Sequence, residues 1–146
     1  MGKKIYVAGS FAQQVAVRAF AQRLRDGGHT VYCFCDEQEP TYTLGVKIRE
    51  TKLVNRVNHK TALVQPDIHN IGVLNWQQLD VADIVIVMLP CGKSAHLEAG
   101  YAVGQGKKVY VYGFLPLGEF DAMYVMMDGV FHEDEFEKLV IVLNAA

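Results

Sequence analysis

A glycine-containing loop followed by a carboxylate is the part of this sequence most able to do chemistry. The loop, residues 90–94, follows an apolar run at 84–89 and precedes a predicted helix that ends near residue 104. Free backbone N–H groups and the positive end of the helix dipole would meet there, which favours an anionic or sugar-like ligand. Glu98 lies within about one turn of the predicted helix start. A carboxylate so placed could attack an anomeric carbon and form a glycosyl ester.

The same residues also have structural interpretations. Glu98 could simply complement the helix dipole, because acidic residues are favoured in the first turn of a helix. The Ser94 side chain could cap the helix, a role that is compatible with a ligand bound by backbone amides. Tyr6, on the first predicted strand, could be a half-buried core tyrosine. His96 is two residues from Glu98 and therefore points to another face of the helix, where we expect it to cap the helix or contact a partner.

Two familiar phosphate-binding patterns are excluded by their spacing. Gly92, Lys93 and Ser94 look like the end of a P-loop, but the position that requires a further glycine is Val87. Residues 9–11 follow the first predicted strand, but residues 12–15 supply no glycine for a dinucleotide fingerprint. A tight turn remains there, and we expect it beside the loop at 90–94.

Apolar runs alternate with amphipathic segments along the chain. Strands are expected at residues 3–8, 30–34, 84–89, 108–112 and 130–131. Helices are expected at residues 13–26, 47–64, 67–79, from the loop at 90–94 to about 104, 123–127 and 133–143. This order predicts one α/β domain over residues 1–146, Rossmann-like, with a mostly parallel sheet of four to five strands and helices on both faces.

Ligands bind at the carboxyl ends of the strands in such sheets. Three loops should lie at those ends: residues 9–13, a polar loop at 36–45, and residues 90–94. Lys52, Arg56 and Lys60 would share one face of the helix at 47–64, most simply a solvated face. A phosphate clamp by Arg49 or Arg56 is the alternative interpretation of these cations.

The composition limits the classes of function. The chain has 146 residues, 51% hydrophobic and 21% charged, with a formal net charge of -2. These values are typical of a globular domain and favour neither nucleic-acid polymers nor membranes as partners. Three cysteines without metal-ligand spacing, and no secretory segment, predict reduced thiols in a cytoplasmic protein. We expect no metal and no redox cofactor.

Four sequence blocks resemble the nucleoside 2-deoxyribosyltransferase superfamily, which includes nucleotide N-glycosidases. The blocks are KIYVAGSF at 4–11, ADIVI at 82–86, HLEAGYA at 96–102 and GKKV at 106–109. The resemblance implies a Rossmann-like fold and cleavage of an N-glycosidic bond, with transfer of the sugar to another base or to water. It places Glu98 as the nucleophile and Tyr6 as the residue that positions its carboxylate. It also implies a homodimer or larger assembly, in which Asp121 and Met123 would belong to a segment donated to the neighbouring pocket.

Two positions depart from the pattern of that superfamily. Asn75 stands where an Asp near the substrate base is usual, and an amide cannot act as a general acid at neutral pH. Gly92 stands where transferases tend to carry Asp and hydrolases Ser, although Ser94 could replace the Ser from a shifted position. These departures leave hydrolysis, or binding without turnover, as alternatives to sugar transfer.

The leading hypothesis is an N-glycosyl-cleaving enzyme that acts on a nucleoside or a nucleoside 5′-monophosphate. Asn75, or a residue of the loop at 36–45, would contact the base. The sugar hydroxyls or the phosphate would be bound by Gly9, Ser10, Phe11, Gly92, Lys93 and Ser94. The alternatives are a nucleotide-binding or sensing module without catalysis, and cleavage of NAD at its nicotinamide–ribose bond.

Overall fold

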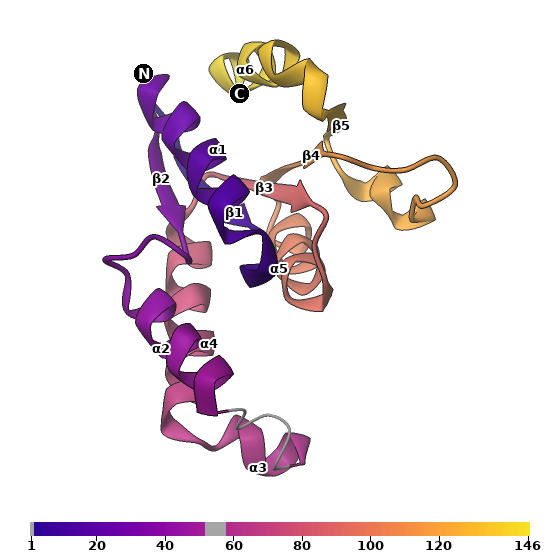
Figure 1. The fold of residues 1–146 in the computed structure, drawn as a ribbon. Helices are drawn as coiled ribbons and strands as arrows, with labels where there is room; N and C mark the ends of the chain where they lie inside the picture. Colours follow the sequence, from indigo (N-terminus) through magenta and orange to yellow (C-terminus); the bar gives the residue numbers. More distant parts are fainter. Residues whose placement is uncertain (1, 52–57) are drawn as a thin grey trace.

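Five parallel strands form the centre of the molecule. The computed structural model describes residues 2–51 and 58–146. Its strands are β1 (Lys4–Ala8), β2 (Thr30–Cys33), β3 (Ile84–Leu89), β4 (Lys108–Gly113) and β5 (Gly129–His132). They are hydrogen-bonded in the order β2-β1-β3-β4-β5, and every pairing is parallel (Figure 1). The expected α/β class is confirmed, with the sheet parallel throughout.

Two helices cover one face of this sheet. They are α1 (Gln14–Asp26), which follows the short 3-10 helix η1 (Phe11–Gln13), and α6 (Phe136–Ala145), which follows η4 (Glu133–Glu135). The apolar side chains of α1 recur at helical spacing and are buried, as are those of α6 that face the sheet. This core contains Ile5, Val7, Val17, Phe20, Leu24, Ile84, Ile86, Leu139 and Leu143.

The opposite face is covered by α5 (Lys93–Gly104) and by the end of α4 (Pro66–Val81). The buried residues of α5 are all alanines, Ala95, Ala99 and Ala102. Such small side chains allow the helix axis to approach the strands closely. Tyr6, which is 0% exposed, lies in this second core, so it faces α5 rather than α1. None of the helices within the described residues is long and apolar enough to cross a membrane.

Helices α2 (Pro40–Thr51) and α4 pack on each other and extend beyond the sheet, with α3 (His59–Leu63) at their far end (Figure 1). The expectation of a polar loop at 36–45 is wrong after residue 39, because Pro40 starts α2. Proline is favoured in the first helical turn, where its missing N–H costs nothing. The expected helix at 47–64 is likewise replaced by parts of α2 and α3, and Lys52 and Arg56 lie outside the described residues.

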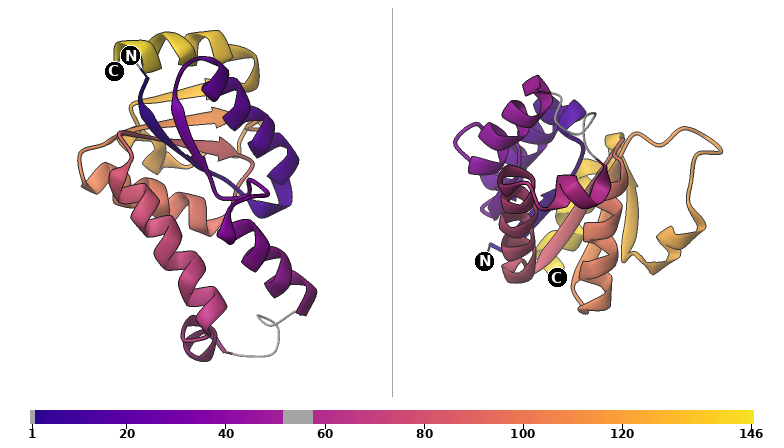
Figure 2. Two further views of the ribbon diagram at one scale, coloured as in Figure 1. Left: turned by 90° about the vertical axis from the view of Figure 1, so that its left-hand side faces the viewer. Right: turned by 90° about the horizontal axis from the view of Figure 1, so that it is seen from below.

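Two other helix predictions need correction at their starts. The helix expected at 67–79 begins one residue earlier, at Pro66, with Gln65 as its N-cap residue. Asp67, in its first turn, pairs with Lys47 of α2, with 2.8 Å between Oδ2 and Nζ. The helix expected at 123–127 is present as the 3-10 helix η3 (Ala122–Met126). It belongs to the connection between β4 and β5, which projects from the body of the molecule (Figure 2).

The carboxyl ends of β3 and β4 approach each other closely at Gly113. This residue has φ +131°, and a Cβ atom there would lie 2.5 Å from the carbonyl oxygen of Leu89. Only glycine satisfies both conditions. The close approach keeps β3 and β4 paired up to the point where the chain leaves β3 for the loop before α5.

Candidate active site

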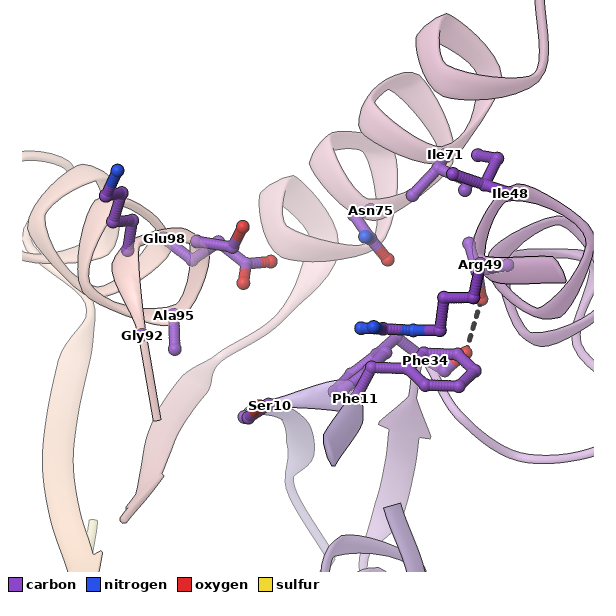
Figure 3. A pocket seen from close by; sticks show the side chains of 15 residues that line it. Ser10, Phe11, Phe34, Ile48, Arg49, Ile71, Asn75, Gly92, Ala95 and Glu98 are labelled. Atoms are coloured by element: carbon purple, nitrogen blue, oxygen red, sulfur yellow. Dashed lines mark hydrogen bonds between the residues drawn. The ribbon is translucent and has the colours of Figure 1, made fainter. Parts of the chain in front are cut away.

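A cavity of about 710 Å³ opens at the carboxyl ends of β1, β2 and β3. Here β1 lies between β2 and β3, so the chain order reverses across the sheet, and such switch points are where open α/β sheets bind ligands. Helices α2, α4 and α5 complete its walls (Figure 3). The residues that line it are Gly9, Ser10, Phe11, Phe34, Thr41, Gly45, Ile48, Arg49, Ile71, Asn75, Gly92, Lys93, Ser94, Ala95 and Glu98.

The Glu98 side chain points from α5 into this cavity (Figure 3). Its Oε2 accepts a hydrogen bond from the hydroxyl of Tyr6 on β1. The Tyr6 ring is fully buried and stacks on Tyr32 of β2, with 5.3 Å between ring centroids. Two neighbouring strands therefore hold the tyrosine that orients the carboxyl group. The predicted proximity of Glu98 and Tyr6 is present in the structure.

The environment of Glu98 differs from the expectation based on the helix dipole. Helix α5 begins at Lys93, and its first turn contains no acidic residue, so Glu98 lies one turn further along. The dipole effect decays within the first turn and gives little help to a charge there. Burial instead raises the pKa of Glu98 to about 8. The interpretation of Glu98 as a dipole-pairing residue is therefore wrong.

The loop before α5 contributes its backbone to the cavity. Gly92 is the N-cap residue and makes no side-chain cap, so the predicted capping role of Ser94 is wrong. Gly92, Lys93 and Ser94 all line the cavity, and the orphan N–H groups of a helix N-terminus are suited to an anion or to sugar hydroxyls. The loop expected to bind the ligand therefore borders the cavity.

The turn after β1 forms the adjoining wall. Ser10 caps η1, because its Oγ accepts a hydrogen bond of 3.2 Å from the backbone N–H of Ala12. Gly9, Ser10 and Phe11 line the cavity together with the loop before α5. The turn and that loop thus lie side by side at the same edge of the sheet, as expected from the parallel strands.

Asn75 of α4 lines the same cavity and is hydrogen-bonded to Tyr32 of β2. Its Oδ1 accepts a hydrogen bond of 2.8 Å from the hydroxyl of Tyr32. That hydroxyl is also 3.2 Å from Oγ1 of Thr41, which donates to the carbonyl oxygen of Phe34 at 2.6 Å. Burial raises the pKa of Tyr32 to about 12, so this tyrosine remains neutral and can serve as a fixed hydrogen-bond donor.

Helix α2 supplies a wall where the sequence predicted a loop at 36–45. Thr41 and Gly45 are four residues apart on its cavity side, and Ile48 and Arg49 follow three and four residues after Gly45. Gly45 allows contact with Phe11, because a Cβ atom would lie 2.7 Å from the Phe11 ring. Recognition of Pro40 as a helix start would have exposed this spacing. Phe34, Ile71 and Ala95 were also missed, because they are apolar residues with no motif of their own.

Three residues discussed at the sequence level lie away from the cavity. Asp121 caps η3 by accepting a hydrogen bond of 2.8 Å from the backbone N–H of Met123, and both residues are exposed on the projecting β4–β5 connection. His96 lies 2.8 Å from the carbonyl oxygen of Gly92 and 2.9 Å from the hydroxyl of Tyr124. It therefore faces away from Glu98, as predicted, while Asp121 and Met123 do not line this cavity in the chain that carries them.

Within residues 2–51 and 58–146, no group of three or more His, Cys, Asp or Glu residues is arranged to hold a metal ion. Cys33 and Cys35 are both buried as free thiols, with 3.4 Å between their sulfur atoms. Cys33 is the last residue of β2, and Cys35 lies just beyond its end.

Comparisons with known proteins identify the fold. No family model matches the sequence, and no curated protein matches it. Among solved structures, the chain resembles a 2-deoxyribosyltransferase from Bacillus psychrosaccharolyticus, at 23% identity and a TM-score of 0.57 over 88% of this chain and 85% of that one. It also resembles a CMP N-glycosidase of Clostridium botulinum, at 14% identity and a TM-score of 0.55 over 98% of each chain. The fold implied by the four sequence blocks is therefore confirmed.

Proposed function

We propose that this protein cleaves the N-glycosidic bond of a nucleoside or a nucleoside 5′-monophosphate, with Glu98 as the nucleophile. The observation that carries the proposal is the Glu98 carboxyl group, which enters the cavity while a buried tyrosine holds one of its oxygens. Two proteins of the same fold, a deoxyribosyltransferase and a CMP N-glycosidase, give independent support for this class of reaction.

The chemistry follows from the position of the carboxyl group. A free carboxylate oxygen of Glu98 attacks C1′ of the sugar, a new C–O bond forms, and the bond between C1′ and the base nitrogen breaks with its electron pair moving to the base. Tyr6 holds Oε2, so that the second oxygen is presented to the sugar. In a second step another base or a water molecule attacks C1′ and releases Glu98. The net result is sugar transfer or hydrolysis.

The loops around Glu98 suit the rest of such a substrate. The backbone of the turn at Gly9, Ser10 and Phe11 and of the loop at Gly92, Lys93 and Ser94, with the two serine hydroxyls, suits the sugar or a 5′-phosphate, whereas the Phe11 ring lies under Arg49 of α2. Asn75 borders the space left for the base. A cavity of about 710 Å³ falls in the size range of pockets that enclose small ligands.

The choice between transfer and hydrolysis depends on what excludes water. Gly92 brings no side chain to orient either a water molecule or an acceptor base, and Ser94 is the nearest hydroxyl on the same loop. We therefore propose hydrolysis as the default outcome and transfer when a free base occupies the pocket. Asp121 and Met123 enter this scheme if a second copy of the chain places its β4–β5 connection over the cavity.

Nucleotide binding without turnover is the second candidate function. It is favoured by the raised pKa of Glu98, since a protonated carboxyl group is no nucleophile, and by Asn75, which cannot protonate a leaving base. A protein of this kind would hold a nucleoside or nucleotide in the same cavity and report its presence through another contact.

Base release separates the two candidates. The protein is incubated at pH 8.5 with a panel of nucleosides and nucleoside 5′-monophosphates, and free base is measured by chromatography. The matched control is Glu98→Gln, which keeps the shape and loses the nucleophile. Base release by the wild type alone supports the enzyme. Binding of a panel member by both proteins, without base release by either, supports the binding module.

A further inference from the structure

A cationic side chain faces Glu98 across the cavity. The Arg49 guanidinium of α2 lies over the ring of Phe11, with 4.4 Å between Cζ and the ring centroid. Phe11 is in turn stacked on Tyr42, with 5.8 Å between centroids. A guanidinium on an aromatic face is held in a plane while its N–H edge remains available for hydrogen bonds. Arg49 is thus pre-oriented, and Figure 3 shows it pointing into the cavity toward Glu98 and Asn75.

Arg49 and Glu98 line one cavity without forming an ion pair. The salt bridges among the described residues include neither side chain, and the pKa of Glu98 is set by its burial. The Arg49 guanidinium is therefore not held by an ion pair with the Glu98 carboxylate. A positive group and a nucleophile that face each other across a gap suit a substrate bound between them.

The surroundings of Arg49 differ from those of the loop before α5. Phe11, Phe34, Ile48 and Ile71 lie around the guanidinium, whereas Gly92, Ala95 and Glu98 lie on the opposite side of the cavity (Figure 3). Aromatic and branched aliphatic side chains pack against a flat base and offer nothing to a phosphate or to sugar hydroxyls. The Arg49 side is therefore the place for the base, and the Gly92 side is the place for the sugar and phosphate.

We propose that Arg49 stabilises the departing base as an anion. The inference rests on the proposed function. In it, Arg49 takes the place of a general acid, which would otherwise protonate the leaving base. When Glu98 forms its bond to C1′, the electron pair of the C1′–N bond moves onto the base and spreads to its ring oxygen or nitrogen atoms. Arg49 donates hydrogen bonds to those atoms, and the released base takes its proton from water. Asn75, which cannot supply that proton, does not need to do so.

The donor chemistry of Arg49 also limits the substrate. A guanidinium carries five N–H donors and no acceptor, so the edge of the base that it contacts must present acceptors. Oxo-pyrimidines and 6-oxopurines have such an edge and spread negative charge onto it. We therefore infer that the preferred base carries a ring carbonyl group on the side that faces α2.

The test compares two pairs of leaving groups in two variants. Arg49→Met removes the charge and keeps much of the side-chain length. Lys47→Met, on the same helix, is the control, because Lys47 does not line the cavity and its side chain is 63% exposed. The substrates are uridine and 5-fluorouridine, and inosine and 7-methylinosine, each also as the 5′-monophosphate. The fluorinated base is the stronger acid, and the methylated base leaves as a neutral molecule.

Arg49→Met should lower kcat for the unmodified base by about 10- to 100-fold, the effect of one hydrogen bond to a charged group. The loss should be smaller for 5-fluorouracil and smallest for 7-methylhypoxanthine as leaving groups, and Lys47→Met should match the wild type. Equal losses for all leaving groups would overturn the proposal. So would a loss confined to the 5′-monophosphates, because Arg49 would then bind the phosphate.

A binding measurement keeps this proposal separate from the proposed function. Calorimetric titration of Glu98→Gln with free uracil and hypoxanthine, with and without Arg49→Met, measures base binding in the absence of catalysis. We expect Arg49→Met to weaken the affinity, by more as the pH rises and the free base ionises. Unchanged affinity would overturn the role of Arg49. Failure of the wild type to release any base would instead overturn the proposed function.

Discussion

The hydroxyl of Tyr6 donates a hydrogen bond to Oε2 of Glu98, a contact between residues 92 positions apart in the chain. Tyr6 is fully buried on β1, in the layer between the sheet and α5. The contact therefore depends on the packing of the whole domain, and the core that stabilises the fold also orients the candidate nucleophile. An isolated carboxylate on α5 would keep the freedom of its side-chain torsions.

Replacement of Tyr6 by Phe tests this contact. The ring and its stacking on Tyr32 are kept, and only the hydrogen bond to Glu98 is lost. We expect kcat to fall by about 10- to 100-fold with little change in KM, because a hydrogen bond to a charged group contributes about 1.5–3 kcal/mol. Steady-state kinetics of base release measure the effect.

Tyr112→Phe, which loses a 2.9 Å hydrogen bond to the carbonyl oxygen of Glu133 on the other face of the sheet, is the control. A similar loss of kcat in that control would mean that folding, and not orientation, is responsible.

The activity should depend on pH through Glu98. Because burial raises the pKa of Glu98 to about 8, most molecules hold it protonated at neutral pH, and only the ionised form can attack C1′. We therefore expect kcat/KM to rise with pH and to level off above pH 8. Measurement of base release from pH 5 to 10 checks this. A profile that is flat across that range, or that falls with rising pH, would contradict Glu98 as the nucleophile.

The same shift makes a prediction about stability. The folded pKa of about 8 lies above the ordinary value of 4.5, so the folded state binds the Glu98 proton more tightly than the unfolded state does. This contribution is fully present below pH 4.5 and is lost as the pH rises to about 8. The difference in free energy of unfolding between wild type and Glu98→Gln should change across that window in this direction. Denaturant titrations at pH 5, 7 and 9 measure it, and a constant difference would show that the Glu98 pKa is not raised.

Helix α6 provides a test of the core. Leu139 is 0% exposed against the sheet, whereas Ile141 on the same helix is 68% exposed. Leu139→Ala should lower the free energy of unfolding by about 2–5 kcal/mol, because it leaves a cavity in packed surroundings. Ile141→Ala should change it by less than about 0.5 kcal/mol. Denaturant unfolding of both variants measures the difference, and equal losses would place α6 differently from the arrangement described above.

The β4–β5 connection predicts an assembly. Leu117 is 103% exposed and Phe120 is 71% exposed, on a segment that projects from the body of the molecule (Figure 2). Contiguous exposed apolar side chains usually mark an interaction surface. If a second copy covers this segment, Leu117→Ser with Phe120→Ser should convert a dimer or larger assembly into monomers in sedimentation experiments. Base release should fall as Asp121 and Met123 leave the neighbouring cavity. A wild type that sediments as a monomer would refute the assembly.

The sequence predicted the sheet well because each strand is a short apolar run. The run at 84–89 is buried in β3 and could only be a strand or a buried helix segment; its length and β-branched residues favour the strand. The parallel arrangement then placed the loops after β1 and β3 at one edge, which is why Gly9 and Gly92 line the same cavity. The order of the strands could not be read from the sequence, because it depends on contacts between distant residues.

The wall formed by α2 was missed for a local reason. Residues 40–45 contain Pro, two Thr and Gly, all of which are common in loops. The polar residues before them also favoured the prediction of a loop. In the structure, packing against α4 stabilises the helix despite these weak propensities. Arg49 was therefore considered only as a phosphate clamp, and its stacking on Phe11 was not foreseen.

The raised pKa of Glu98 could not be predicted from the sequence either. Spacing alone suggested that the carboxylate sits in the first turn, where the helix dipole lowers a pKa. The actual start of α5 at Lys93 moves Glu98 out of reach of that effect, and its burial beside Tyr6 acts in the opposite direction. Burial, which the sequence does not show, therefore gives the pKa shift of Glu98 the opposite sign to the one expected.

Mass spectrometry of the quenched reaction tests the central claim most directly. The wild type is mixed at pH 8.5 with the panel member that it cleaves fastest, quenched with acid within the first turnover, and digested with a protease. The account predicts that the peptide containing Glu98 gains the mass of the sugar residue, and that Glu98→Gln gives neither the adduct nor free base. Release of base by Glu98→Gln at the wild-type rate, with no adduct on the wild-type peptide, would contradict it.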